Sequence, residues 1–213
     1  MAERYPGYDV LAKRHTPSWN AQTRRVVDER LAMPREPRFF SPAEFRTLEA
    51  ITTRITPQPS HRPPIPVASL IDDKLMRHRH DGYRAASMPK DGEAWKLGLR
   101  ALDAETQRLC RCLFHLLDPA RQDEVLRHVE AGDAHSVEWG GMPSQTFFRQ
   151  RLLTDVVRAY WSHPTAWSEI GWGGPASPRG YVRMGYDRRD PWEALEARGD
   201  DQDAVRQENR HVG

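Results

Sequence analysis

Hydrophobic residues recur at helical spacing through the middle of this chain, and the clearest case begins at Ser41. The Ser41 hydroxyl can accept a hydrogen bond from the Glu44 amide, the Glu44 carboxylate can accept one from the Ser41 amide, and Pro42 suits the first helical position. Pro57 stops the pattern, because proline lacks a backbone donor and clashes with the preceding turn. Between them, apolar residues follow one face at steps of three and four: Phe45, Leu48, Ile51 and Ile55. This segment is therefore predicted to be an amphipathic helix.

The same periodicity predicts further helices, and no segment alternates at period two over a useful length, as a strand would. The predicted helices are, in chain order, residues 20–31, 67–76, 91–102, a stretch capped by Asp103 that packs Leu109, Leu113, Phe114, Leu116 and Leu117, residues 118–132 and residues 144–161. Asn20 or Ser18 caps the first of these, and Asp118 followed by Pro119 starts the fifth. We therefore predict an all-α fold, an irregular helical bundle with extended N- and C-terminal arms.

Composition divides the chain into three parts. Residues 1–38 are polar and interrupted by prolines, and they are predicted to form an arm with one short helix. Residues 39–162 carry the helical periodicity and are predicted to form the helical core. Residues 163–213 are rich in aromatic residues, glycine and proline, which break helical and strand periods alike. We predict an irregular tail there that wraps a partner, with about the last 15 residues disordered.

Large aromatic side chains crowd the later part of the chain, between residues 138 and 192. Each ring can remove about 150–250 Å² from water, and a short loop wrapped on its own domain does not hide all of that surface. A partner protein would cover the remainder, since interfaces enrich Trp, Tyr and Arg. We predict six partner contacts: Trp139, Trp161, Trp167, Trp172, Tyr181 and Trp192. A place in the helical core is the alternative for Trp139 and Trp161.

The composition supports the same view. Of the 213 residues, 38% are hydrophobic and 29% are charged, and the mean hydropathy is −0.79. A chain this polar either exposes long segments or completes its hydrophobic burial with another molecule. The formal net charge of +2 gives no general electrostatic attraction to nucleic acid. Local arginine clusters leave a nucleic-acid-binding module as an alternative function.

The two cysteines, Cys110 and Cys112, lie two positions apart in a predicted helix. Residues at this spacing do not face each other on a helix, so the two thiols are predicted not to bridge to one another. Buried or half-buried thiols in a reducing compartment are the favoured interpretation, and a disulfide to another subunit is the alternative. Neither cysteine belongs to a zinc-binding or haem-attachment motif.

The N-terminal region contains no address for export or membrane insertion. Arg24-Arg25 resembles the start of a twin-arginine signal, but the residues that follow, Val26-Val27-Asp28-Glu29-Arg30, provide no hydrophobic region. No window approaches the 18 or so apolar residues that a membrane span needs. We expect a cytoplasmic location, or a periplasmic one if a partner carries the export signal.

Candidate catalytic and metal-binding groups gather around His78, His80 and Asp81, and a stand-alone enzyme built on them is an alternative function. Metal ligands must converge at about 2 Å with supporting groups behind them, whereas neighbouring arginines such as Arg79 would repel a cation. No Gly-x-Ser-x-Gly or dinucleotide fingerprint occurs, and prolines, rather than a helix start, follow the glycines of 171–174. We therefore assign no catalytic, cofactor-binding or metal-binding residue.

The order and spacing of several short patterns resemble a known family, the gluconate 2-dehydrogenase subunit 3 family, between about Phe39 and Pro175. The patterns are Phe45-x-x-Leu48-x-Ala50-Ile51-x-x-x-Ile55-x-Pro57, Gly98-Leu99 with Leu102-Asp103, Phe114-x-x-Leu117, Gln122, Val125-Leu126, Phe147-Phe148, Tyr160-Trp161 and Trp167-x-x-Ile170-Gly171-x-x-Gly174. The resemblance implies a small helical subunit without catalytic residues or a cofactor of its own.

The resemblance implies a particular kind of partner for this chain, a large flavoprotein subunit. The large subunit of such complexes is a glucose–methanol–choline-type oxidoreductase that binds FAD, oxidises a sugar or alcohol C–OH and passes electrons to a cytochrome or other acceptor. The small subunit supports its folding and, in many members, carries the twin-arginine signal that exports the pair. This sequence departs from that pattern, because it shows no such signal and because Thr165-Ala166-Trp167 follows Pro164 where relatives have a glycine-rich, asparagine-containing stretch.

Overall fold

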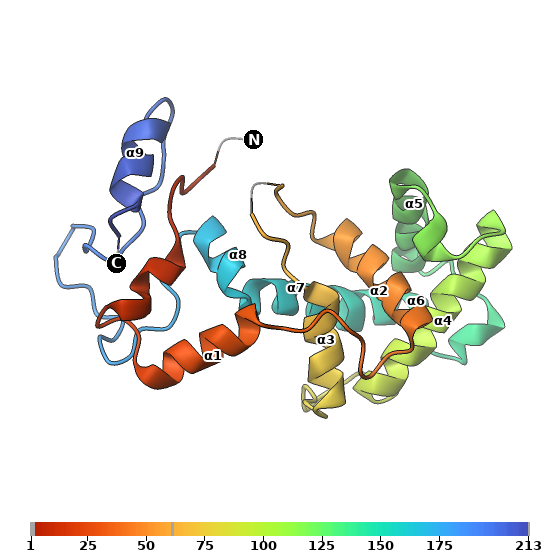
Figure 1. Ribbon diagram of the computed structural model, residues 1–213. Helices are drawn as coiled ribbons and strands as arrows, with labels where there is room; N and C mark the ends of the chain where they lie inside the picture. Colours follow the sequence, from red (N-terminus) through yellow and green to blue (C-terminus); the bar gives the residue numbers. More distant parts are fainter. Residues whose placement is uncertain (1–2, 61, 213) are drawn as a thin grey trace. The chain divides into compact units, whose positions relative to one another are not determined.

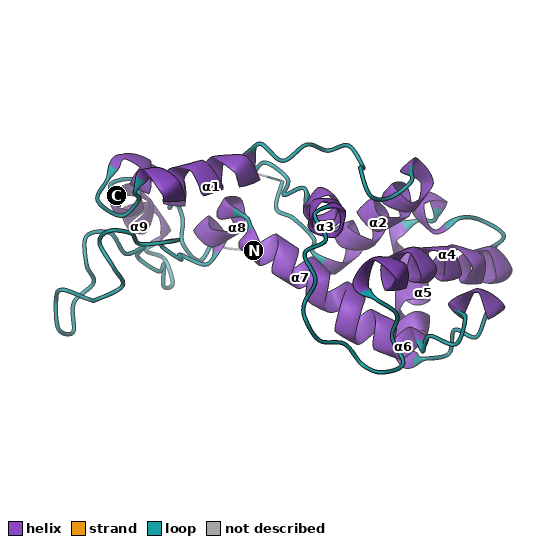
Figure 2. Cartoon of the chain, turned by 90° about the horizontal axis from the view of Figure 1, so that it is seen from below, coloured by secondary structure: helices purple, strands orange, loops and turns teal. Residues whose placement is uncertain are grey.

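The computed structural model describes residues 3–60 and 62–212, which form helices joined by loops (Figure 1). No strand occurs within these residues (Figure 2), so the prediction of an all-α fold is confirmed. None of the described helices combines the length and hydrophobicity that crossing a bilayer requires. The chain divides into two compact units: unit 1 comprises Met1–Met33, His61–Ile65 and Trp161–Gly213, and unit 2 comprises Pro34–Ser60 and Pro66–Tyr160.

Unit 2 contains most of the helices. They are α2 (Pro42–Ile55), α3 (Val67–Met76), α4 (Asp91–Cys110), α5 (Pro119–Ala131), α6 (Ser144–Thr146) and most of α7 (Leu153–Ser162), with the 3₁₀ turns η2 (Phe114–Leu116) and η3 (Val137–Trp139) and the π-helical segment η4 (Phe147–Leu152). Helix α2 lies beside α3, α4 and α5, and η4 packs on α4 (Figure 1). The result is an irregular bundle around α4.

Local side-chain chemistry starts and ends these helices as the sequence predicts. Ser41 and Glu44 form the reciprocal capping box at the start of α2, with Pro42 in the first position. Asp118 accepts hydrogen bonds from two backbone amides at the start of α5, and Gly132 ends that helix in the left-handed conformation, with φ 89°. These helix boundaries are confirmed because each depends on neighbours in the sequence.

The core of unit 2 is built around Trp95 of α4, which is fully buried. Its ring meets Phe40 and Phe147 edge to face, at centroid distances of 6.3 and 5.7 Å. The close approach of η4 requires Gly98, because a Cβ there would lie 2.2 Å from the Phe147 ring. Gly98 thus allows the Phe147 ring of η4 to pack against α4, although glycine weakens a helix by itself.

One predicted helix boundary in unit 2 is wrong. Asp103 does not cap a new helix: α4 continues through it to Cys110 and ends at Arg111, whose φ is 59°. The Asp103 carboxylate instead accepts hydrogen bonds from Thr47 and the Phe114 amide, at 2.9 and 3.0 Å. The helix predicted at 144–161 is found from Ser144 to Ser162, and its part η4 is π-helical.

Unit 1 brings the two ends of the chain together. Its elements are η1 (Val10–His15), α1 (Ala21–Leu31), α8 (Pro164–Glu169) and α9 (Gln202–Asn209). Its buried core combines residues from both ends, namely Tyr8, Val10, Trp19, Val27, Trp167 and Val212. Backbone hydrogen bonds join the same segments, from Asn20 to the Ser177 carbonyl at 2.6 Å and from Ser177 to the Ser18 carbonyl at 2.9 Å. The sequence-based division treats these ends as separate arms, whereas in the structure most of both belongs to unit 1.

The described part of the last 15 residues, for which the composition predicts disorder, contains α9. The buried Asn209 explains the order. Its amide group donates to the carbonyls of Pro6 and Leu195, at 3.0 and 2.9 Å, and its side-chain oxygen accepts from the Leu195 amide at 2.8 Å. A polar segment can fold without much apolar burial when a satisfied buried amide fixes it in place.

Candidate partner interface

The six predicted contact residues fall into two groups by exposure. Trp139 and Trp167 are buried, with exposed fractions of 4% and 2%. Trp139 packs against Phe147 in unit 2, with ring centroids 5.7 Å apart. The Trp167 indole donates a hydrogen bond to the Trp161 carbonyl at 2.8 Å in unit 1. Both rings are buried within their own unit, as the alternative interpretation has it for Trp139, and a partner contact by either residue stays a prediction.

The other four retain surface. Trp161 and Trp172 are each 41% exposed, Tyr181 is 71% exposed and Trp192 is half-buried. Trp172 stands edge to face against Trp167, with centroids 4.8 Å apart. Trp192 lies under the Arg179 guanidinium, 4.4 Å from the ring centroid. Their contact with a partner remains a prediction, and each of the four side chains keeps part of its surface exposed.

Tyr181 belongs to a longer exposed segment, residues 181–186, which we call the apolar loop. Its large side chains are Tyr181, Val182, Met184 and Tyr186, and the last of these is 93% exposed. Only Tyr181 is singled out by the sequence analysis, because a run without a helical or strand period gives no means of distinguishing inward from outward positions.

Polar contacts fix the base of the apolar loop. The buried carboxylate of Asp190 accepts hydrogen bonds from the Met184 and Gly185 amides, at 2.8 and 3.2 Å. Arg183 forms a two-pronged ion pair with Glu193, at 3.0 and 3.1 Å. The loop is therefore held in one conformation although its tip is exposed.

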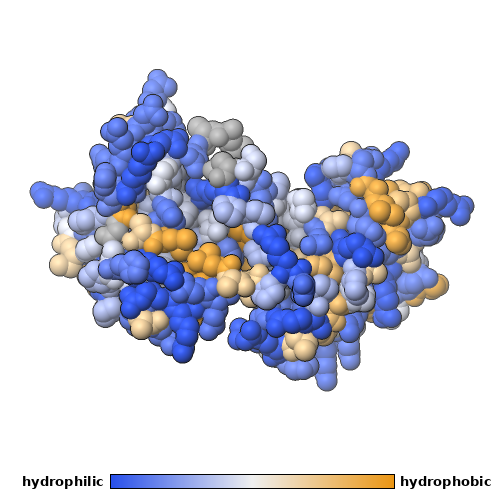
Figure 3. All heavy atoms as spheres, in the orientation of Figure 1, coloured by the Kyte–Doolittle hydropathy of each residue, from blue (hydrophilic) through white to orange (hydrophobic). Residues whose placement is uncertain are grey.

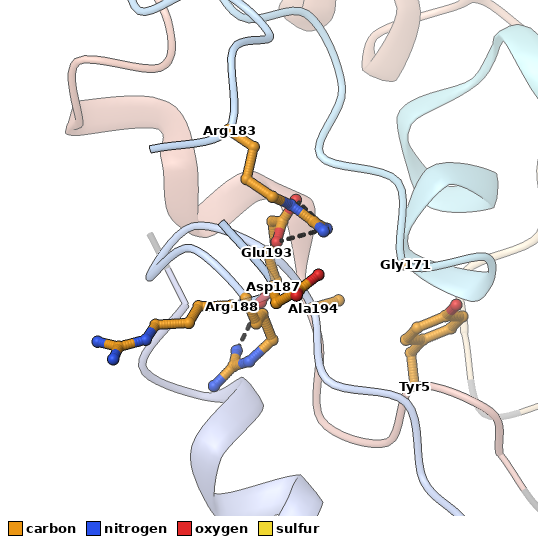
Figure 4. Close-up of a pocket in the computed structure, with 8 residues that line it drawn as sticks. Tyr5, Gly171, Arg183, Asp187, Arg188, Glu193 and Ala194 are labelled. Atoms are coloured by element: carbon orange, nitrogen blue, oxygen red, sulfur yellow. Dashed lines mark hydrogen bonds and ion pairs between the residues drawn. The ribbon is translucent and has the colours of Figure 1, made fainter. Parts of the chain in front are cut away.

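A hollow of about 440 Å³ lies beside this base (Figure 4). Its lining residues are Tyr5, Gly171, Arg183, Asp187, Arg188, Arg189, Glu193 and Ala194. Two of its arginines are engaged, Arg183 with Glu193 and Arg189 with Glu208 at 2.9 Å. Gly171 is required at this wall, since φ is 65° and a Cβ would lie 2.5 Å from the Tyr5 ring. The hollow is thus largely charge-balanced, and it gives no specific site for an anion.

Unit 2 carries a second exposed apolar surface, which we call the leucine patch. It consists of Leu109 at the end of α4 and Leu113 and Leu116 around η2, and Leu116 is 65% exposed. Hydrophobic residues gather over the region where α4 and α5 meet (Figure 3). A regular helix through this segment, as the sequence predicts, would pack these leucines. The left-handed turn at Arg111 instead redirects the chain.

The two cysteines lie within the same segment. Cys110 and Cys112 are half-buried and unbridged, but Cys112 lies beyond the end of α4, so the helical spacing from which this was predicted does not apply. The Cys112 thiol lies 3.3 Å from the Leu113 carbonyl.

The cluster of His78, His80 and Asp81 does not assemble a metal site: over residues 3–60 and 62–212, no three potential metal ligands come together. The Asp81 carboxylate instead pairs with Lys74 and Arg151, at 2.8 and 2.9 Å. Burial by itself raises the pKa of Asp81, but the two cations outweigh it and hold that pKa below the ordinary value. This carboxylate therefore stays charged and serves a structural ion network.

That network extends into the core of unit 2. The buried Asp155 carboxylate accepts hydrogen bonds from Lys74 and from the Trp95 indole, both at 2.8 Å. Arg151 reaches Asp91 at 2.6 Å. Of the three residues that suggest catalysis in the sequence, Asp81 is thus used to neutralise Lys74 and Arg151, and the geometry offers no support for an enzyme built on His78, His80 and Asp81.

Comparison with known proteins agrees with the resemblance found in the sequence. The family model described as gluconate 2-dehydrogenase subunit 3 matches residues 42–174, which contain the leucine patch but not the apolar loop. Neither the curated proteins nor the solved structures gave a significant match. Since the family model covers more than half of the chain, the protein belongs to the gluconate 2-dehydrogenase subunit 3 family.

Proposed function

We propose that this protein is the non-catalytic small subunit of an FAD-dependent sugar or alcohol dehydrogenase complex. Membership in the gluconate 2-dehydrogenase subunit 3 family is the observation that carries the proposal, because the family is named for a subunit of a dehydrogenase complex. The partner in this proposal is a large subunit of the glucose–methanol–choline type, which holds FAD and performs the oxidation. The small subunit stabilises that partner.

The exposed apolar surface supports a role in assembly. The leucine patch lies inside the family-matched residues, so it is the natural candidate for the contact that family members share. Burying an exposed leucine stabilises an association by about 1.5–3 kcal/mol at most, and a few such residues at the centre of an interface can dominate its affinity.

Purification from the native host tests the proposal. A tagged copy of the chain should co-purify with a yellow protein from which FAD is released on denaturation. Sugar- or alcohol-dependent reduction of an artificial electron acceptor should follow the two-protein complex through the columns. The absence of a flavoprotein from the purified material would contradict the proposal, and so would dehydrogenase activity in the chain alone.

Substitutions can assign the contact to the leucine patch. The double change Leu113→Ser and Leu116→Ser should reduce the recovery of the flavoprotein several-fold while leaving the circular dichroism spectrum unchanged. Met76→Ser is a matched control, because Met76 is also exposed on unit 2 but lies outside the patch. Equal recovery with all three proteins would exclude the patch as the contact.

A further inference from the structure

The apolar loop exposes hydrophobic side chains from a fixed backbone. An unstructured tail would lose conformational entropy on binding, but the amides of Met184 and Gly185 are already held by the buried Asp190 carboxylate. The Glu193 carboxylate, besides pairing with Arg183, accepts a hydrogen bond from the Asp190 amide at 2.9 Å. Pre-organisation of this kind lowers the entropic cost of association.

Contacts with N-terminal residues hold the chain on both sides of the apolar loop. The buried Lys13 ammonium donates a hydrogen bond to the Trp192 carbonyl. Arg179, which stacks on the Trp192 ring, also donates to the Ser18 hydroxyl at 3.1 Å. Both ends of the loop are therefore anchored to the N-terminal segment, and only its tip is left without contacts that would bury it.

The apolar loop lies outside the residues that the family model matches, which end at Gly174. A surface common to the family should lie within the matched region, as the leucine patch does. A pre-organised exposed element beyond that region fits a contact particular to this chain and its own partner.

The charges around the loop argue against a lipid surface as its target. Attraction to anionic lipids needs several uncompensated basic residues. Here Arg183 is paired with Glu193 and Arg189 with Glu208, whereas Arg179 stacks on Trp192 and keeps its charge. Among the described residues Arg188 makes no side-chain ion pair, and Asp187 precedes it.

A second copy of the chain is also a poor target. The hollow in unit 1 contains Arg183, Arg188 and Arg189, and two hollows in unit 2, of about 340 and 190 Å³, each contain Arg84. Charged side chains of both signs line these hollows, among them Asp187 and Glu193 in the first, Asp81 in the second and Asp91 in the third, so none of the three offers an apolar lining to Met184 and Tyr186. An apolar pocket with carboxylates at its rim is the complementary surface, and tyrosine, methionine and arginine are the residue types that protein interfaces enrich.

We propose that the apolar loop inserts into an apolar pocket, rimmed by carboxylates, on the flavoprotein subunit, and that it determines which dehydrogenase subunit this chain recognises. The inference rests on the proposed function and deepens it. Met184 and Tyr186 fill the pocket, and Arg188 meets the acidic rim.

Binding of the full-length chain to the separately purified flavoprotein subunit tests this inference by biolayer interferometry. The double change Met184→Ser and Tyr186→Ser should weaken the affinity roughly tenfold or more, since two central anchors are removed. Val137→Ser is the matched control, because Val137 is equally exposed but lies in unit 2, and its affinity should equal that of the wild type. Arg188→Glu should slow association and reverse the salt dependence of the association rate.

The controls separate the possible failures. If the wild-type chain does not bind the flavoprotein, the proposed function fails and this inference fails with it. If the wild type binds and the double variant binds equally well, only this inference is overturned. If the wild type sediments with vesicles of phosphatidylglycerol and the double variant does not, the loop binds a lipid surface. If the wild type is a dimer and the double variant is a monomer, the loop binds a second copy of the chain. Either result would also overturn this inference.

Discussion

Asp155 shows how much one buried charge can matter in unit 2. Its carboxylate is almost completely buried and compensates Lys74. We expect Asp155→Ala to lower the free energy of unfolding by about 3 kcal/mol, because it removes a buried carboxylate that faces Lys74 and Arg151 and accepts the hydrogen bond of the Trp95 indole. Urea denaturation followed by circular dichroism would measure the change.

A surface pair provides the control for that prediction. Arg54 and Asp123 form a two-pronged ion pair at 2.8 Å, but both side chains are partly in solvent. Removing it by Asp123→Ala should cost less than about 1 kcal/mol. Similar losses in the two variants would mean that the buried network contributes no more than a surface salt bridge.

Lys13 gives unit 1 a characteristic pH dependence. Burial and the nearby Arg179 lower the pKa of Lys13 to about 8, from the ordinary 10.5. Between these two values the unfolded chain holds a proton on this group that the folded chain has released, so stability rises with pH across that window. The buried charge costs stability below it, where both states are protonated.

Lys13→Met should remove the rise in the free energy of unfolding that Lys13 causes between its folded and unfolded pKa values. The measured quantity is the difference between wild type and variant in the free energy of unfolding, followed from pH 7 to 10 by chemical denaturation. The subtraction matters because Tyr8, whose pKa is raised by burial, acts in the opposite direction near the upper end. A difference that stays constant with pH would contradict the lowered pKa.

Among the elements, α2 is the one whose start depends most clearly on a few side-chain atoms. The Ser41 hydroxyl accepts from the Glu44 amide at 3.3 Å, and the Glu44 carboxylate accepts from the Ser41 amide at 2.9 Å. Because Ser41 is exposed, Ser41→Ala removes the cap without making a cavity. We expect a loss of about 1 kcal/mol in the free energy of unfolding. Thr53→Ala, an exposed change within the same helix, should be close to neutral, and an equal loss there would argue against the cap.

The element scale also shows where sequence reasoning works and where it fails. Caps such as Ser41 and Asp118 are predictable, because the residues that satisfy the helix end are neighbours in the chain. The length of α4 is not predictable in this way, because the Asp103 carboxylate accepts hydrogen bonds from residues of α2 and η2 rather than from the backbone amides that follow it. The exposure of Leu116 follows from the left-handed turn at Arg111, for which no glycine gives warning.

For the whole molecule, the joining of the two chain ends in unit 1 is the feature that the sequence does not show. Trp19 and Trp167 share one core although they lie far apart in the chain. By composition each end of the chain is polar and irregular. The hydrophobic residues of each end are buried only because the fold brings the other end against them. The same reason explains the candidate interface: Trp167 is hidden by distant residues, whereas Tyr181, from the same aromatic stretch, is not.

Two units with separate cores lead to a prediction about how the molecule unfolds. Trp19→Ala should lower the stability of unit 1 by about 3–5 kcal/mol, because it empties a large buried site. Gly98→Ala should lower that of unit 2 by about 1–3 kcal/mol, because the added Cβ overlaps the buried Phe147 ring. Scanning calorimetry of the isolated chain should then show two transitions, one shifted by each change. The boundary between the units falls within α7, after Tyr160. Coupling through this helix would bring the two transition temperatures closer together, but each substitution would still lower mainly one of them. A single transition that both substitutions lower together would mean that the chain unfolds as one cooperative domain.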